Sequence, residues 1–176
     1  MTNTALDHRV ELDDAELAVL LGLLRQRTAR DGATLDTART SLLRRRLVQI
    51  HDAELHLPAP LLAALLPLAA PTIAIASDGP TSTAALLGGL RDGWAGLALR
   101  HQRTWTVWAV PADDLGETLA EVLPDEATLV RLTRTGASRR VVGVELATDE
   151  LRADPRVLDR LLREHPLSNP GPRATN

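Results

Sequence analysis

The chain has 176 residues, of which 44% are hydrophobic, and a formal net charge of −3. These values suit one good core or two small abutting subdomains, and neither a disordered chain nor a strongly basic nucleic-acid binder. There is no cysteine, lysine, phenylalanine or tyrosine, which excludes disulfides, thiolate zinc sites, a cysteine nucleophile, a P-loop or Schiff-base lysine, and base stacking on Phe or Tyr.

Membrane and export signals are not expected. The longest apolar candidate, residues 55–76, contains four prolines and His56, whereas a bilayer span needs roughly 20 mostly apolar residues. The N-terminus lacks the basic and apolar regions of a signal peptide. We therefore expect a cytoplasmic location and no membrane partner.

Apolar periodicity predicts a helical front. Helices are expected over 13–27, 35–47 and 58–71, the last beginning at a proline. Between the second and third helices, residues 48–57 alternate and turn at His51-Asp52, which predicts a small hairpin or wing. This order is typical of a winged helix.

From residue 72 the period changes to that of strands. The strands are expected over 72–76, 94–100, 104–110, 127–133 and 139–147, with helices over 112–123 and 154–165. Residues 85–93 are ambiguous, because two adjacent glycines weaken a helix. The predicted class is α+β: a winged-helix-like helical front (10–71) packed with a mostly antiparallel sheet and flanking helices (72–164) in the order β–ββ–α–ββ–α. The Pro/Gly/Ser/Asn-rich tail, 165–176, is expected to be disordered.

Acidic residues mark the helix starts. Asp13 with Glu16 predicts a capping box at the first helix, and Asp114 with Glu117 predicts another at the helix of 112–123. Asp154 is expected to cap the last helix. Capping accounts for these acid pairs, so they do not indicate catalysis.

The arginine run ends the second predicted helix. On a helical wheel Arg39 and Arg46 share one line along the apolar edge, while Arg44 and Arg45 lie on the polar face. Residues 35–48 include no Asn or Gln to read base edges. The pattern favours a solvated or salt-bridged face, and contact of Arg44 and Arg45 with DNA is the alternative.

Histidines and loop residues indicate no catalytic or metal site. His51 and His56 lie on the predicted wing, five residues apart, so one strand would direct them to opposite faces. The hydroxyl-rich loop 77–83 has no lysine and only loosely spaced glycines, unlike a phosphate loop. Catalytic-motif spacings are also missing. We expect no enzyme, no cofactor and no metal.

The three tryptophans are the most informative side chains. A three-residue loop over 101–103 would pair Arg100 with Thr104, and Trp105 would then lie in the core. Trp94 and Trp108 would lie on the second sheet face, which is either covered by helices or an apolar patch for a protein partner. Trp94, Trp108 and Arg100 are therefore the candidate partner-binding residues.

Three stretches carry a family resemblance: "ELDDAELAVLLGLL", "LLRRRLVQIHDAELHLPAPLLAALLPLAAPTIAIA" and "LALRHQRTWTVWAVPADDLGETLAEVLP". Within residues 10–124, they resemble EspG-type proteins, the cytosolic chaperones of actinobacterial type VII (ESX) secretion. Leu47 stands where that family usually has a glycine, and the chain would supply about one of the family's two related halves. The resemblance implies a non-enzymatic protein that binds a helical secretion substrate on the sheet and its loops, and a relative of this length would pair with itself as a homodimer.

The alternative function is a winged-helix DNA-binding regulator that uses Arg44, Arg45 and the 48–57 wing.

Overall fold

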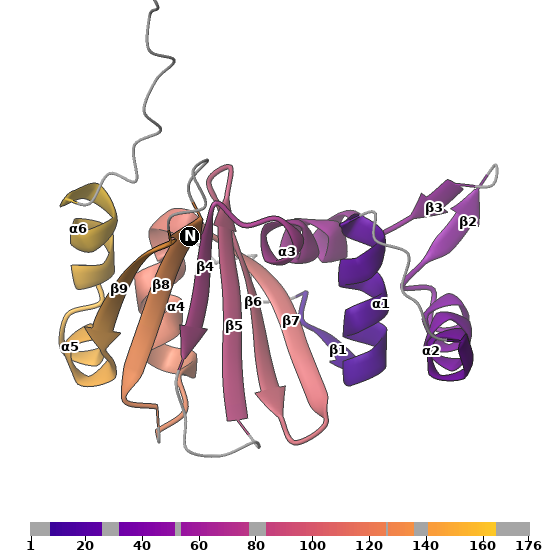
Figure 1. Cartoon of the computed structure of the whole chain (residues 1–176), viewed down its shortest axis with the longest axis horizontal. Helices are drawn as coiled ribbons and strands as arrows, with labels where there is room; N and C mark the ends of the chain where they lie inside the picture. The colour runs from indigo at the N-terminus through magenta and orange to yellow at the C-terminus, as the bar shows by residue number, and fades with distance from the viewer. Residues whose placement is uncertain are drawn as a thin grey trace, which may run out of the picture.

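The computed structural model describes residues 8–25, 32–51, 54–77, 84–125, 127–135 and 141–164. Its centre is a seven-stranded sheet in the order β1-β7-β6-β5-β4-β8-β9, in which every neighbouring pair is antiparallel (Figure 1). The strands are β1 (Val10–Asp13), β4 (Ile73–Ser77), β5 (Ala84–Arg91), β6 (Trp94–His101), β7 (Thr104–Pro111), β8 (Leu129–Thr135) and β9 (Val141–Ala147). The predicted α+β class with an antiparallel sheet is confirmed.

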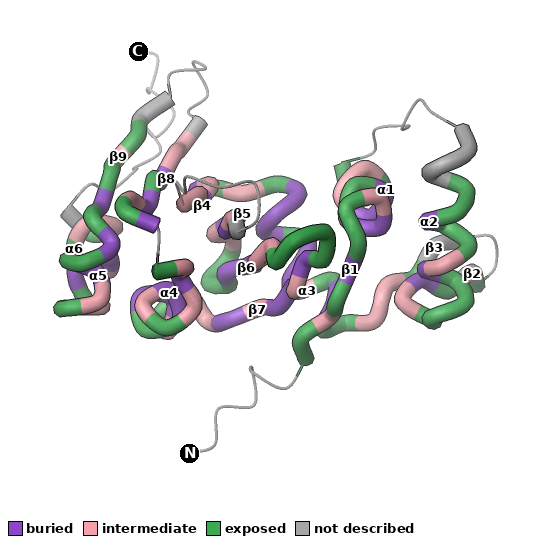
Figure 2. Tube along the Cα trace, turned by 90° about the horizontal axis from the view of Figure 1, so that it is seen from below, coloured by how far each residue is buried: buried purple, intermediate pink, exposed green. Residues whose placement is uncertain are grey.

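In the described part of the chain, six α-helices and a small hairpin surround the sheet. The helices are α1 (Asp14–Leu24), α2 (Gly32–Arg44), α3 (Ala59–Ala69), α4 (Leu115–Val122), α5 (Thr148–Ala153) and α6 (Val157–Glu164). The hairpin of β2 (Gln49–His51) and β3 (Glu54–His56) connects α2 to α3, as the alternating pattern predicted. Figures 1 and 2 show α1 and α4 on opposite sides of the sheet. The predicted tail, 165–176, lies outside the described residues.

Each side of the sheet has its own core. Trp108, Leu97 and Leu86 pack with residues of α4, α5 and α6. On the other side, Trp105 and Val107 pack with residues of β1, α1, α2 and α3. The N-terminal segment therefore contributes the edge strand β1 and shares a core with the strands that follow it.

The element order differs from the predicted β–ββ–α–ββ–α at three places. Residues 84–91 form a full strand, β1 is an additional strand at 10–13, and a short additional helix, α5, precedes α6, which is the predicted last helix. Asp154 follows α5, and its side chain accepts a hydrogen bond from the Arg156 backbone N–H at 3.1 Å. This polar junction separates the two helices.

A pair of glycines lets α3 lie directly on strands β5 and β6. Gly89 of β5 lies opposite Gly96 of β6. A Cβ at Gly89 would lie 2.1 Å from the Pro67 carbonyl oxygen, and one at Gly96 would lie 2.0 Å from the Ala64 carbonyl oxygen. The backbone of α3 therefore lies directly on β5 and β6, and only glycine leaves room for it.

The capping predictions had different outcomes. At α1, the Glu16 N–H donates to Asp13 Oδ1 at 2.7 Å and the Asp13 N–H donates to Glu16 Oε2 at 3.1 Å, which confirms the capping box. The box predicted for α4 is wrong, because Asp114 makes no side-chain capping bond. A 3-10 turn over Ala112–Asp114 runs directly into α4, so Asp114 already has a helical backbone.

The predicted register of the β6–β7 hairpin is wrong by one residue. The turn contains Gln102 and Arg103 alone, so His101 pairs with Thr104 and Arg100 pairs with Trp105. Gln102 takes a left-handed φ of 56°, which a two-residue turn requires and which nothing in its residue type indicates. The slip exchanges the faces of β6 relative to β7, so Leu97 shares a face with Trp108.

Candidate partner-binding surface

Large exposed hydrophobic side chains concentrate in one part of the molecule. Among the described residues, the large hydrophobic side chains that are exposed to solvent are Leu23, Leu43, Leu62, Leu66, Leu87 and Trp94. They belong to α1, α2, α3, β5 and β6. In the parts of α4, α5 and α6 whose burial is described, no large hydrophobic residue is exposed. The asymmetry distinguishes the α3 side of the sheet from the α4 side.

Strand alternation places Trp94 and Leu87 on the α3 side. Successive side chains of a strand point to opposite faces, so residues two apart share a face. Trp94 lies two residues before Gly96, and Leu87 lies two residues before Gly89. Since both glycines contact α3, Trp94 and Leu87 flank this helix on the same face of the sheet.

The outer face of α3 adds two leucines. Leu62 and Leu66 are one helical turn apart and are each 37% exposed, whereas Leu61 and Leu65 are buried. We define the α3 surface as Leu62, Leu66, Leu87 and Trp94. Trp94 is its most exposed member, at 46%.

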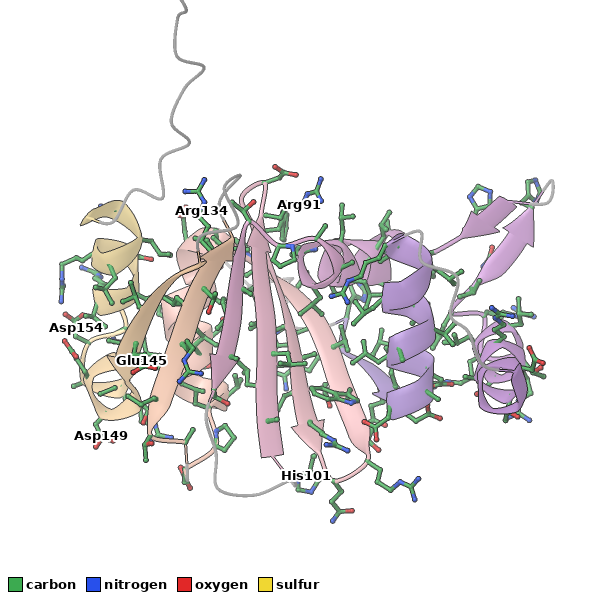
Figure 3. All side chains as sticks on the ribbon, viewed as in Figure 1. Arg91, His101, Arg134, Glu145, Asp149 and Asp154 are labelled. Atoms are coloured by element: carbon green, nitrogen blue, oxygen red, sulfur yellow. The ribbon has the colours of Figure 1, made fainter. Side chains whose placement is uncertain are left out.

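Beyond α3 the same face of the sheet becomes polar. The strand registers place Leu87, Ala76, Arg131 and Glu145 in one row across β5, β4, β8 and β9. Arg131 Nη2 donates to Glu145 Oε1 at 2.8 Å, and the two side chains are 61% and 52% exposed. Figure 3 labels Glu145 on β9. This row gives the apolar α3 surface a charged border of the kind that surrounds many protein interfaces.

Of the three predicted partner-binding residues, Trp94 alone has the expected exposure. The prediction that Trp108 is an exposed anchor is wrong. Trp108 is 1% exposed and lies in the core under α4–α6, with the Arg9 guanidinium carbon 5.1 Å from its ring centroid. The physical reason is that helices cover this face of the sheet, which was one of the two alternatives for it.

Arg100 is engaged within the protein. Its Nη2 lies 3.1 Å from Asp14 Oδ2, and its guanidinium carbon lies 5.7 Å from the Trp105 ring centroid. Trp105 Nε1 donates to the other oxygen of Asp14 at 2.7 Å. These contacts hold the first turn of α1 on β6 and β7, so Arg100 has a structural role and is not a free binding group.

The arginine run does not form one basic face. The helix ends at Arg44, and Arg46 has a left-handed φ of 57°, so the predicted line of Arg39 and Arg46 along one helix face is wrong. Arg45 Nη1 donates to Glu16 Oε2 at 2.6 Å, and its Nη2 donates to the Glu11 carbonyl oxygen. The Arg45 charge is thus directed towards α1.

Glu16 is the buried partner of this ion pair, with 2% of its surface exposed. Burial by itself raises the pKa of the Glu16 carboxyl, but hydrogen bonds from Ser41, the Asp13 backbone and Arg45, together with the Arg45 charge, lower it below the ordinary value overall. Glu16 therefore carries a charge that ties α1 to the end of α2.

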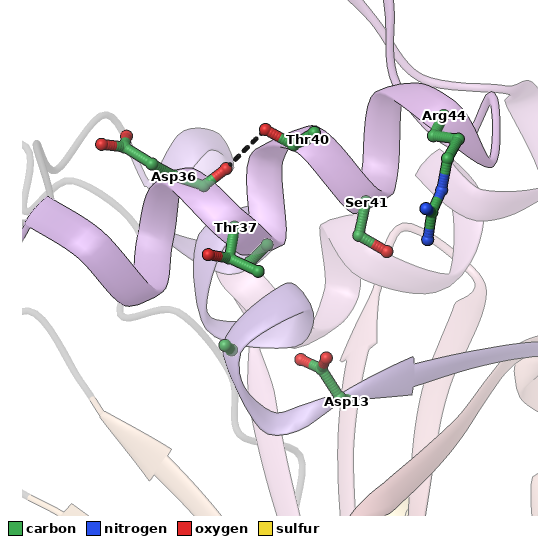
Figure 4. A pocket seen from close by; sticks show the side chains of 8 residues that line it. Asp13, Asp36, Thr37, Thr40, Ser41 and Arg44 are labelled. Carbon is green, nitrogen blue, oxygen red and sulfur yellow. Dashed lines mark hydrogen bonds between the residues drawn. The ribbon is translucent and has the colours of Figure 1, made fainter.

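Arg44 lies in a groove between the start of α1 and α2 (Figure 4). The groove is lined by Asp13, Ala15, Asp36, Thr37, Ala38, Thr40, Ser41 and Arg44. Two carboxylates share the groove with the single arginine, so its electrostatics disfavour a phosphate. Neither Arg44 nor Arg45 is thus arranged as a phosphate-binding site.

The hairpin histidines share a face, contrary to the prediction. The register pairs His51 with Glu54 and Gln49 with His56, and the two imidazole rings meet edge-on with centroids 6.2 Å apart. The turn reverses the chain between them, so counting along one strand does not apply. Among the described residues there is no group of three or more His, Cys, Asp or Glu side chains that could hold a metal.

The chain matches no known protein-family model, and a search of curated proteins finds no relative. In the described part of the chain, no helix is long and apolar enough to cross a membrane.

Proposed function

We propose that this protein is a non-enzymatic, cytoplasmic protein-binding module similar to a type VII secretion substrate chaperone. The observation that carries the proposal is the α3 surface, which holds four of the six large hydrophobic side chains that are exposed among the described residues. Exposed apolar groups gathered on one face are typical of a site for a protein partner.

The chemistry of the α3 surface suits an amphipathic helix. Leu62 and Leu66 offer a ridge one turn apart, and Trp94 is a large anchor of the kind enriched among residues that dominate binding energy. A helix could place its apolar stripe on these side chains and its polar edge towards Arg131 and Glu145. The helical secretion substrate implied by the family resemblance has this chemistry.

The DNA-binding alternative has weaker support. It requires Arg44 and Arg45 to approach phosphates together, whereas Arg45 is paired with Glu16 and Arg44 shares its groove with Asp13 and Asp36. The winged-helix likeness therefore rests on the helix–helix–hairpin–helix order. A gel shift with duplex DNA at ~50 mM salt tests this alternative, because phosphate contacts are strong at low salt.

The experiment for the proposed function is a binding titration. Small proteins with amphipathic helices, of the kind that type VII systems secrete, would be purified separately and titrated into the full chain by calorimetry. We expect Trp94→Ala to weaken binding by about 30-fold or more, since a central aromatic anchor contributes at least ~2 kcal/mol. Leu43→Ala is the matched control, because Leu43 is a similarly exposed leucine on α2, outside the α3 surface.

Comparing the two variants distinguishes a loss of affinity caused at the α3 surface from one caused by a general loss of structure. Equal affinity of Trp94→Ala and the unmodified chain would remove the α3 surface as the binding site. Failure of every helical substrate to bind would remove the secretion-chaperone proposal itself.

A further inference from the structure

The sheet ends in a long strand with one open edge. β9 pairs with β8 along all seven of its residues, and among the described strands it has no partner on its other side (Figure 1). The opposite edge strand, β1, has four residues and leads directly into α1. An unpaired strand edge presents a row of N–H and C=O groups that can pair with another strand.

β9 has few of the features that protect edge strands. Its sequence, VVGVELA, contains no proline and no lysine. Its single charged residue, Glu145, accepts two hydrogen bonds from Arg131 of β8, at 2.8 and 3.0 Å, and so is directed along its own sheet. Natural sheets usually block an exposed edge with charge, proline or a bulge. The open edge of β9 thus has the character of an interface.

The core beneath β9 is also left incomplete. Val144 is half-buried, although its neighbour two positions on, Leu146, is 2% exposed in the core. On α6, Leu161 and Leu162 are half-buried at the margin of the same core. Another sheet continuing beyond β9 would cover these side chains.

We propose that β9 pairs antiparallel with β9 of a second copy of this chain, about a two-fold axis at Val144. This register uses all seven strand residues and keeps the α4 side of both sheets on the same side. It places Gly143 opposite Glu145 of the second copy, twice by symmetry. A register centred on Glu145 would instead bring two carboxylates together, which is unfavourable across strands.

Gly143 allows this register to be tested with matched variants. It is exposed, and a Cβ there would have a single neighbour within 4 Å, the Leu132 carbonyl oxygen at 3.9 Å, so a longer side chain fits the monomer. Gly143→Glu would place a carboxylate opposite Glu145 of the second copy, whereas Gly143→Lys would place an ammonium group there.

Sedimentation equilibrium of the full chain, with circular dichroism to verify folding, measures the outcome. The unmodified chain and Gly143→Lys should have twice the 19.0 kDa chain mass, and Gly143→Glu should raise the dimer dissociation constant roughly tenfold through two like-charge pairs. A monomeric unmodified chain at ~100 μM, a concentration well above the Kd of an ordinary stable interface, would overturn the proposal. So would a dimer that both variants leave unchanged.

Hydrogen exchange of the unmodified chain gives a second test that needs no variant. Amides of 141–147 should become more protected as the concentration rises, because strand pairing buries the open edge. Protection of β9 independent of concentration would contradict the interface. This inference does not depend on the partner bound at the α3 surface, so either proposal can fail alone.

Discussion

Replacing Gly96 by alanine should displace α3 from the sheet. The new Cβ would lie 2.0 Å from the Ala64 carbonyl oxygen, which is 1.0 Å closer than the 3.0 Å below which real Cβ contacts essentially never occur. The obstacle is helix backbone, which cannot rotate away, and α3 carries the buried Leu61 and Leu65. Overpacking costs about 1–3 kcal/mol, which exceeds the roughly 0.5–1 kcal/mol that alanine gains over glycine in a strand. Because the clash is with rigid backbone, we take the upper end of this cost, about 3 kcal/mol, and expect a net loss of about 2 kcal/mol.

Thermal unfolding followed by circular dichroism measures this loss. For a chain of this size, about 2 kcal/mol corresponds to a Tm lower by roughly 4–8 °C. Gly143→Ala is the matched control, because its new Cβ would meet no atom closer than 3.9 Å, and its Tm should stay equal or rise. If Gly96→Ala melts no lower than Gly143→Ala, the close approach of α3 to β6 is refuted.

The remaining predictions concern the tryptophans and the buried ion pair. Trp108→Ala should lose about 3–5 kcal/mol of unfolding free energy in urea, because it empties a fully buried site, whereas Trp94→Ala should stay within about 0.5 kcal/mol; similar losses for the two would contradict their placement. Glu16 has a lowered pKa, so its contribution is complete above the ordinary glutamate pKa of about 4.3 and is lost as the pH falls through the lower folded value. Glu16→Gln should lower the free energy of unfolding by roughly 2 kcal/mol at pH 7, which is less than for a fully buried pair because Arg45 remains 38% exposed. It should also flatten the dependence of this free energy on pH between about pH 5 and 3. An unchanged slope in urea titrations over this acid range would count against the pairing.

Local chemistry made several elements predictable. The leucines of α1 recur at helical spacing after Asp13, and Asp13 and Glu16 satisfy each other's backbone groups within one turn. Pro58 precedes α3 and suits the start of a helix. Such signals act over three or four residues, so they are complete in the sequence.

The candidate site was less predictable, because it depends on one turn and on distant contacts. The left-handed conformation of Gln102 decided the β6–β7 register, and with it which face of β6 meets Trp105 and which meets Trp108. The α3 surface depends on the position of Gly96 beneath Ala64, a contact between distant residues that places Trp94 beside the helix.

What the sequence determined by itself is the α+β class, most helix positions and the absence of cysteine and lysine chemistry, since these follow from composition and short-range periodicity. The tertiary structure alone decided which charges and aromatic residues are free. Arg45 is bound by Glu16, which lies 29 positions away, and Arg100 by Asp14, which lies 86 positions away. A local sequence pattern cannot indicate pairs so distant in the chain, because these pairs form only when folding packs α1 against α2 and the sheet.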